Sequence, residues 1–210
     1  MDGVGEPQRR HVGLNLSDHP EEAGEVESDV FGFWIFLMSD AVLFALLFAV
    51  YGTMLDATAG APGPAQVFKI EPTFIETLLL LTSSFTFGMA SIALKRDVGA
   101  RRLVLWLVAT LLLGLAFLAM EGNDFAIMAA AQATPDRSGF LSAFFMLVGM
   151  HGLHVTIGLI WTIVMLAQLA TLGRDRNVKL NLIRLSLFWH FLDIVWIAIF
   201  SVVYLQGLIQ

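Results

Sequence analysis

Five ionisable side chains lie inside apolar stretches of the sequence, where they could hold a cofactor or move protons. His151 and His154 stand three residues apart in the run FFMLVGMHGLHVTIGLIW, and His190 and Asp193 have the same spacing in RLSLFWHFLDIVW. In a helix, this spacing places both members of a pair on one face. Asp40 lies within VFGFWIFLMSDAVLFALLFAVY. Such groups can ligate haem or a metal, carry protons, or hydrogen-bond a neighbouring helix.

The elements that position these residues are predicted to be membrane-spanning helices. Hydrophobic residues make up 57% of the 210, and the mean hydropathy of +0.76 is too high for a soluble domain. We therefore predict an all-α integral membrane protein in which residues 30–210 form one five-helix bundle. Its spans are the five apolar runs long enough to cross a hydrocarbon core of roughly 30 Å, namely Val30–Leu55, Thr73–Leu94, Leu103–Met120, Ser142–Leu172 and Leu185–Leu208.

The distribution of charge predicts how the chain is oriented. Residues 1–29 carry eight acidic and two basic side chains and little to bury, so we expect a mobile cytoplasmic arm. An N-terminus on the inner side would place ten basic residues inside and two, Lys69 and Arg137, outside. The positive-inside rule therefore predicts an N-in, C-out topology. The ten inner residues are Arg9, Arg10, Lys95, Arg96, Arg101, Arg102, Arg174, Arg176, Lys179 and Arg184.

The polar groups of three predicted helices lie at overlapping depths. At 1.5 Å per residue, Asp40 is about 15 Å from Val30, and Asp193 is about 13 Å from the inner side. His151 and His154 lie about 13 and 18 Å from the outer side. We therefore expect one cluster where the first, fourth and fifth helices meet, with Asp40 mostly protonated and bonded to His154 or to backbone. A knot of interhelical hydrogen bonds is favoured over proton-handling chemistry.

Two glutamates mark the outer half of the predicted bundle. Glu76 lies about 6 Å inside the second span, where it can face headgroups, loops or a partner. Glu121 ends the third span and is expected to be solvated. Small residues accompany these groups and should let helix backbones approach closely, which favours packing over a roomy cofactor pocket. They are Ser84, Gly88, Gly149, Gly152 and Gly158.

Redox and transport functions are poorly supported by these patterns. His151 and His154 share one face of one helix, so they cannot sandwich a haem. The chain has no cysteine and no phosphate loop, dinucleotide fingerprint or H-E-x-x-H motif. We expect no catalytic, cofactor-binding or metal-ligating residue. A small proton-coupled transporter using Asp40 and Asp193 is the alternative from another class, although no inverted repeat is evident.

Four segments of the sequence resemble subunit III of the haem–copper respiratory oxidases, and most closely its five-helix, quinol-oxidising branch of the cytochrome o type. The resemblance extends from about Phe31 to Gly207, and HGLHV and WHFLDIVW are its most specific strings. The segments are GFWIFLMSDAVLFALLFAVY, ETLLLLTSSFTFGMA, DRSGFLSAFFMLVGMHGLHVTIGLIW and SLFWHFLDIVWIAIFSVVYLQG.

The resemblance implies a supporting subunit of a proton-pumping quinol oxidase in the bacterial inner membrane. In this family the haems and copper lie in subunit I, so this chain would hold no cofactor and no catalytic centre. It would pack against subunit I, together with subunits II and IV, hold phospholipid in a cleft, and keep subunit I stable and supplied with protons. His151 and His154 would then be structural or lipid-cleft groups.

Two departures from the family pattern qualify the resemblance. Cytochrome c oxidases of the family usually have seven helices and a glutamate where Asp40 stands, whereas this chain has five helices and an aspartate, as in the quinol-oxidising branch. The segment MEGNDFAIM, with Glu121 and Asp124, is less acidic and aromatic than the family's segment after the third span. Accessory proteins of nitric oxide reductases share the five-helix fold and are the alternative within this class.

Overall fold

The structure is a computed structural model that describes residues 20–60, 70–96, 99–173 and 175–207. Over these residues the chain is helical apart from its connections, and five helices are long and apolar enough to cross a membrane. The predicted all-α, five-span architecture is therefore confirmed. The helices are α1 (Pro20–Thr53), α3 (Ile70–Lys95), α4 (Ala100–Ala130), α5 (Gly139–Thr171) and α6 (Arg176–Ile199), with a 3-10 turn η1 (Pro135–Arg137) and a π-helical segment η2 (Phe200–Leu205).

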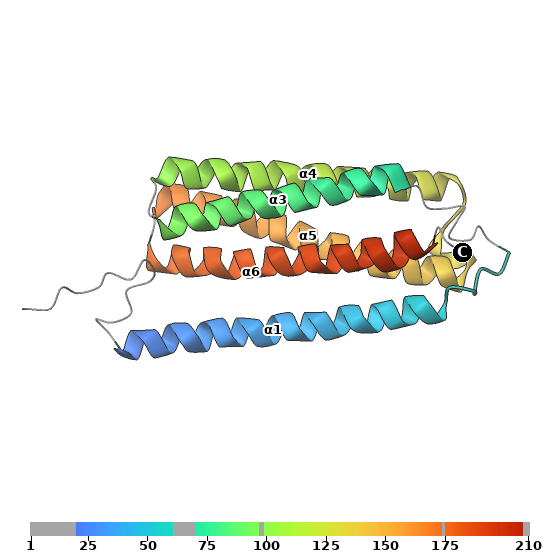
Figure 1. Ribbon diagram of the computed structural model, residues 1–210, viewed down its shortest axis with the longest axis horizontal. Coiled ribbons are helices and arrows are strands. Elements are labelled where there is room, and N and C mark those ends of the chain that lie inside the picture. Colours follow the sequence, from blue (N-terminus) through green and yellow to red (C-terminus); the bar gives the residue numbers. More distant parts are fainter. Residues whose placement is uncertain (1–19, 61–69, 97–98, 174, 208–210) are drawn as a thin grey trace, which may run out of the picture.

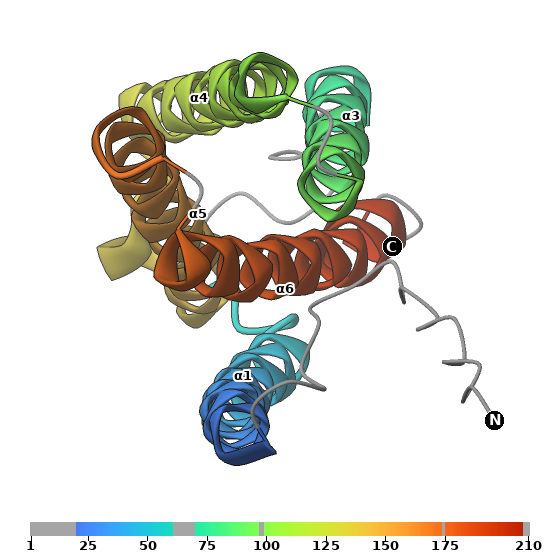
Figure 2. The same ribbon diagram turned by 90° about the vertical axis from the view of Figure 1, so that its left-hand side faces the viewer.

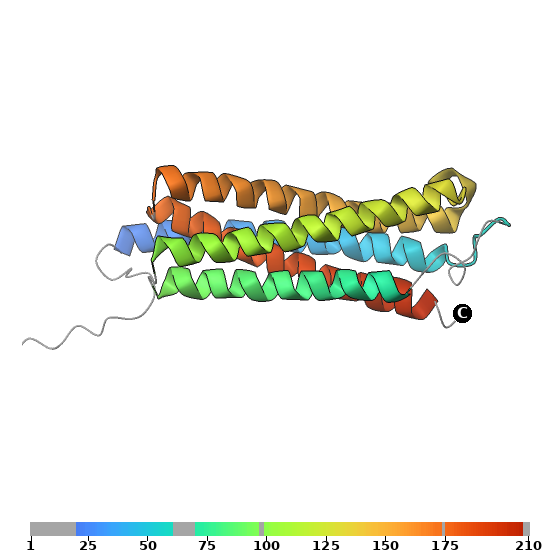
Figure 3. The same ribbon diagram turned by 90° about the horizontal axis from the view of Figure 1, so that it is seen from above.

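Four of the helices form a closed bundle, and the fifth lies on its outside. In the end view of Figure 2, α3, α4, α5 and α6 surround a common core, and α1 stands apart from α3 and α4. The contacts agree, because α1 packs against α5 and α6, whereas α3 packs against α4 and α6. Figure 3 shows α3 and α4 side by side along the long axis. The four helices thus form the bundle, and α1 packs along the face formed by α5 and α6.

Successive helices run in opposite directions. The beginning of α1 and the end of α6 therefore lie at opposite ends of the bundle, as an odd number of spans requires (Figure 1). Which end faces the cytoplasm is not set by this arrangement, so the N-in, C-out orientation stays a prediction.

The helices extend beyond the apolar runs that predicted them. The clearest case is α4, which continues to Ala130, although the apolar run ends at Met120. Helical hydrogen bonds do not require apolar side chains, so a helix passes through polar residues when its neighbours still pack against it. At the other end of the chain, α1 begins at Pro20, and its apolar part is Phe31–Thr53. The predicted arm overlaps the start of this helix, and residues 1–19 lie outside the described residues.

Aromatic side chains fill the bundle core. The ring of Trp196 meets Phe117 edge to face at 4.7 Å between centroids, and Trp189 stacks on Phe87 at 6.1 Å. Glycines make room for Trp189, because a Cβ added at Gly114 or Gly158 would lie 3.1 or 3.2 Å from its ring. Gly158 therefore allows close packing as predicted, and the core positions the polar side chains described next.

Candidate functional site

Asp40 and His154 form a pair between α1 and α5. Asp40 Oδ2 lies 3.5 Å from His154 Nε2, and both side chains are largely buried. His154 Nδ1 is 2.8 Å from the backbone oxygen of Met150. A carbonyl oxygen only accepts, so Nδ1 carries a hydrogen and donates it to Met150. The other nitrogen, Nε2, therefore faces Asp40 either as an acceptor or as a protonated donor, but at 3.5 Å no hydrogen bond to Asp40 Oδ2 is formed in the structure.

His190 and Asp193 form a second pair, on α6, which faces α3. His190 Nδ1 lies 3.7 Å from Asp193 Oδ2 and 2.9 Å from the hydroxyl of Ser84. Ser84 thus contributes a hydrogen bond in addition to its small size. No hydrogen bond or ion pair among the described residues joins this pair to Asp40 and His154. The polar groups of α1, α5 and α6 are therefore arranged as two pairs, whereas the depth argument predicts one cluster.

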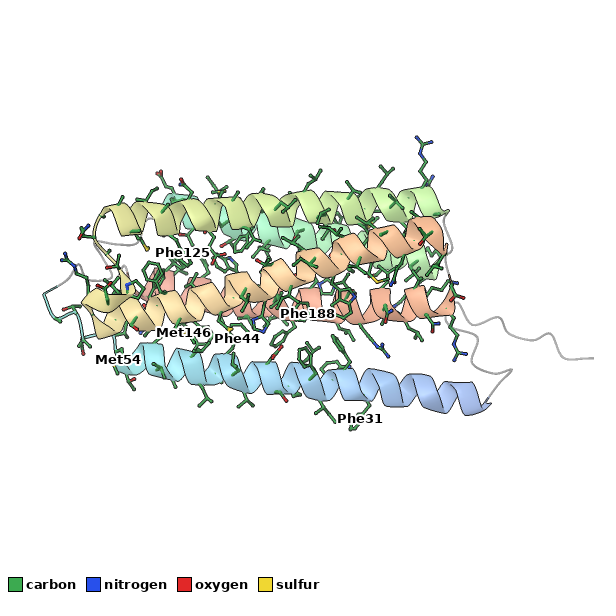
Figure 4. All side chains as sticks on the ribbon, turned by 180° about the vertical axis from the view of Figure 1, so that it is seen from behind. Phe31, Phe44, Met54, Phe125, Met146 and Phe188 are labelled. Atoms are coloured by element: carbon green, nitrogen blue, oxygen red, sulfur yellow. The ribbon has the colours of Figure 1, made fainter. Side chains whose placement is uncertain are left out.

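His151 is enclosed by aromatic rings. Its side chain is fully buried, and neither ring nitrogen has a hydrogen-bond partner. The rings of Trp196, Phe117 and Phe44 surround it, with centroids 5.2, 6.0 and 6.4 Å away. Phe44 also contacts His154 and is drawn between α1 and α5 in Figure 4. Although His151 and His154 are one turn apart, they occupy different surroundings, and both contact α1 through Phe44.

Glu76 and Glu121 are both buried, and Glu121 corrects a prediction. Glu121 is only 4% exposed, whereas its position at the end of an apolar run predicted a solvated side chain. The reason is that α4 continues past it and packs on α5, so its carboxyl lies against Gly152. Glu76 is 1% exposed and faces the protein interior. The carboxyls of Glu76, Glu121 and Asp124 lie close enough to interact electrostatically.

The structure also contains a stripe of hydroxyl side chains on α3 that the sequence analysis did not predict as a site. These hydroxyls bond to α6 and α4, and two of them accept the indole N–H groups of buried tryptophans. The recurring Thr and Ser residues in ETLLLLTSSFTFGMAS are the signal that identifies the stripe. The bonds are Trp196 Nε1 to Thr77 Oγ1 (3.1 Å), Trp189 Nε1 to Ser83 Oγ (3.1 Å), Thr86 to Thr110 (2.8 Å) and Ser91 to Ser186 (3.2 Å).

The described side chains are arranged for hydrogen bonding and packing. Within these residues, no group of three or more His, Cys, Asp and Glu side chains could hold a metal ion. His151 is sealed by rings, and His154 and His190 already contact partners inside the chain. What the arrangement offers chemically is a set of shareable protons on carboxyl, imidazole and hydroxyl groups inside a membrane bundle.

Comparison with known proteins points to one family. A family model described as cytochrome c oxidase subunit III matches residues 23–208. Cytochrome bo(3) ubiquinol oxidase subunit 3 from Pseudomonas aeruginosa is 48% identical over 191 residues, covering 90% of each chain. Quinol oxidase subunit 3 from Bacillus subtilis is 41% identical over 191 residues, covering 91% of this chain and 92% of its own. Cytochrome c oxidase subunit 3 from Alkalihalophilus pseudofirmus is 39% identical over 194 residues, covering 91% and 94%.

Proposed function

Because this chain belongs to the cytochrome c oxidase subunit III family, we propose that it is the non-redox subunit III of a terminal oxidase that oxidises quinol in the bacterial inner membrane. In this role it packs against subunit I, which carries the haems and copper, and assembles with subunits II and IV. The observation that carries the proposal is the similarity to ubiquinol oxidase subunit 3 at 48% identity over 90% of both chains.

The polar residues of the bundle support a stabilising role. The indoles of Trp189 and Trp196 are bonded to hydroxyls on α3, and His190 is bonded to Ser84. Interhelical hydrogen bonds of this kind stabilise membrane helices by roughly 0.6 kcal/mol each on average. A bundle held together in this way suits a chain that supports a catalytic neighbour.

The outer surface of the chain supports contact with lipid and with other membrane helices. Large apolar side chains are exposed on every helix, including Phe31 on α1, Phe85 on α3 and Ile194 on α6. Phe31 points away from the bundle, whereas Phe44 points toward it (Figure 4). We propose that phospholipid chains cover part of this surface and that subunit I covers another part.

Asp40 and His154 are the residues we propose for proton supply, if this chain contributes to it. They lie between α1 and the bundle, and their facing atoms, 3.5 Å apart, are near enough for a proton to pass from one group to the other. In contrast, His151 has no polar contact through which it could exchange a proton among the described residues.

The proposal is tested by purifying the tagged chain from membranes in a mild detergent. We expect haem–copper subunits to co-purify, with quinol-dependent oxygen consumption that exceeds consumption with reduced cytochrome c. The chain purified alone should give no haem signal in a pyridine haemochrome spectrum and no copper by metal analysis. Stoichiometric haem in the isolated chain would contradict the supporting role. A preference for cytochrome c, as the name of the Alkalihalophilus relative suggests for that protein, would contradict the choice of quinol.

A further inference from the structure

A groove lies between α4 and α5 on the outer surface of the bundle. It has a volume of about 190 Å³, well above the roughly 10–15 Å³ that one water molecule needs. The groove is defined by Leu118, Glu121, Gly122 and Phe125 on α4 and by Gly149, Gly152 and Thr156 on α5. Figure 4 shows Phe125 on the side of α4 that faces α5.

The carboxyl of Glu121 lies in this groove without a partner. The residue is 96% buried, as its exposure of 4% implies, yet neither carboxyl oxygen has a hydrogen bond. A buried polar group without a partner is costly, and in native proteins such groups usually find one. The hydroxyl of Thr156 is also in the groove, but it donates to its own helix at Gly152 O. No described residue donates a hydrogen bond to Glu121, so its hydrogen bonding is left open to a donor that enters the groove.

The groove exists because three of its lining residues are glycines, which have no side chain. A Cβ added at Gly122 or at Gly149 would meet nothing within 4 Å, whereas one added at Gly152 would lie 3.1 Å from Glu121 Oε1. Gly149 and Gly122 therefore serve no packing contact within the described chain. Small residues on the exposed face of a membrane helix let another helix backbone approach closely.

The depth of the groove argues against a lipid headgroup as its occupant. Gly152 is the fourteenth of the 33 residues of α5, close to the helix midpoint and about 20 Å from Gly139. Headgroups lie outside a hydrocarbon core whose midplane is roughly 15 Å deep. A side chain on a second membrane helix reaches this depth without difficulty.

The charged residues near the groove indicate what kind of partner Glu121 would bind. Glu76 and Asp124 interact electrostatically with Glu121, so a further acidic side chain is disfavoured as its partner. No lysine or arginine occurs in Gly139–Thr171, and those of α4 lie at its opposite end, at Arg101 and Arg102. A partner with an N–H or O–H group would complete the hydrogen bonding of Glu121.

From these observations we infer that the α4–α5 groove is the docking surface for a membrane helix of another oxidase subunit, which places a hydrogen-bond donor side chain against Glu121. This inference rests on the proposed function, since that function supplies the complex in which the second helix occurs. It assigns this face of the chain to an interface between subunits.

The first test fills the groove and uses a matched control. Gly149→Leu and Gly88→Leu both replace a half-buried helical glycine whose added Cβ meets nothing, and both gain the same helix propensity. Only Gly149 lies in the groove. In the oxidase complex purified through a tag on this chain, we expect Gly149→Leu to reduce co-purification of the other subunits by about tenfold. Gly88→Leu should leave it unchanged. Equal yields for both variants would overturn the inference.

The second test removes the acceptor. Glu121→Gln keeps an oxygen that accepts a hydrogen bond, so it should retain most of the co-purified subunits. Glu121→Leu keeps the approximate volume but accepts nothing, so it should lose them. Wild-type yield in Glu121→Leu would show that no donor faces this residue.

The third test identifies the neighbour directly. A photoreactive benzoylphenylalanine replaces Met146, an exposed residue of α5 that lies three positions from Gly149 and outside the groove lining, and, as the control, the exposed Phe85 on α3. In the intact oxidase, the residue at position 146 should form an adduct with one other oxidase subunit. An adduct with lipid, with a protein outside the oxidase, or with nothing would overturn the inference. Failure of the wild-type chain to co-purify with any haem–copper subunit would instead overturn the proposed function.

Discussion

The α3–α6 interface and the α4–α5 groove both place polar side chains inside the membrane, but they differ in how those groups are satisfied. Across α3 and α6, the indole of Trp189 donates to Ser83 and that of Trp196 donates to Thr77. In the groove, both carboxyl oxygens of Glu121 lack a partner, although the residue is buried. In hydrocarbon an unsatisfied polar group costs several kcal/mol. The two indole N–H groups of the first region are thus satisfied within the chain, although both carboxyl oxygens of Asp193 on α6 lack a hydrogen bond. In the groove, neither oxygen of Glu121 is satisfied by the described residues.

The glycines of the two regions repeat this contrast. Gly158 lies under Trp189 and Phe188, and its added Cβ would come within 3.2–3.3 Å of both rings. Gly149, on the same helix, faces open space. Small residues therefore serve two purposes on α5. One accommodates a ring from inside the chain, and the other leaves room for something outside it.

The largest effect on the isolated chain is expected from Gly158→Leu. The new side chain would press on two aromatic rings in the core, and overpacking of this kind destabilises by about 1–3 kcal/mol. Gly149→Leu should not destabilise the isolated chain, because its side chain enters open space. Unfolding of both purified variants in detergent, followed by circular dichroism, measures the difference. An equal loss of stability in both variants would show that the two glycines do not differ in their packing.

A smaller effect is expected from removing an acceptor in the α3–α6 interface. Ser83→Ala leaves the buried indole N–H of Trp189 without its hydrogen bond, and should reduce stability by about 0.6–1.7 kcal/mol. The matched control is Ser39→Ala on α1, because the exposed Ser39 hydroxyl bonds only to Ile35 O of its own helix. The same unfolding assay compares them. Indistinguishable curves for Ser83→Ala and wild type would show that the hydroxyl is not needed there.

The comparison also shows what the sequence alone could establish. Hydropathy was sufficient for the five helices, because long apolar runs identify spans regardless of which helix packs on which. It was insufficient for Glu121, since the burial of a polar residue depends on a neighbouring helix. The prediction that Glu121 is solvated failed because α4 continues to Ala130 and packs on α5.

Side-chain pairing shows the same division. Spacing within one helix predicted that His190 and Asp193 could meet, and they lie 3.7 Å apart. Depth alone could not tell which helices are neighbours, so the single expected cluster is two pairs. The bond of Ser84 to His190 depends on α3 lying beside α6, an arrangement that no local pattern contains.

The contact of Asp40 with His154 is weaker than the hydrogen bonds of the α3–α6 interface. Variants of Asp40 should therefore have smaller effects on stability than Ser83→Ala. Its contact with His154, at 3.5 Å, is longer than a strong hydrogen bond. Asp40→Asn keeps size and hydrogen bonding, so assembly should survive it. Asp40→Leu should reduce stability by about 0.6 kcal/mol, the average for one such bond.

Complex yield and quinol-oxidase rate, measured together, separate the roles of Asp40. If the carboxyl relays protons, Asp40→Asn will lower turnover while yield and lipid content stay normal. If it serves packing only, turnover per complex will be unchanged in Asp40→Asn. Full yield and full activity in Asp40→Leu would contradict both roles.

The last prediction concerns the orientation of the chain in the membrane, and its variants should not change stability. With the predicted N-in, C-out topology, the connection after α1 is outside and the end of α5 is inside. The chain has no cysteine of its own, so single cysteines report cleanly. Thr58→Cys, in the connection after α1, should react with an impermeant maleimide added to intact cells, whereas Leu172→Cys, at the end of α5, should react only after the membrane is opened. Both positions lie outside the packed core, so folding should be unaffected. Labelling of Leu172→Cys but not of Thr58→Cys in intact cells would show that the chain has the opposite orientation in the membrane. The carboxyls of Glu76 and Glu121, which the predicted topology places in the outer half of the bundle, would then lie in the inner half.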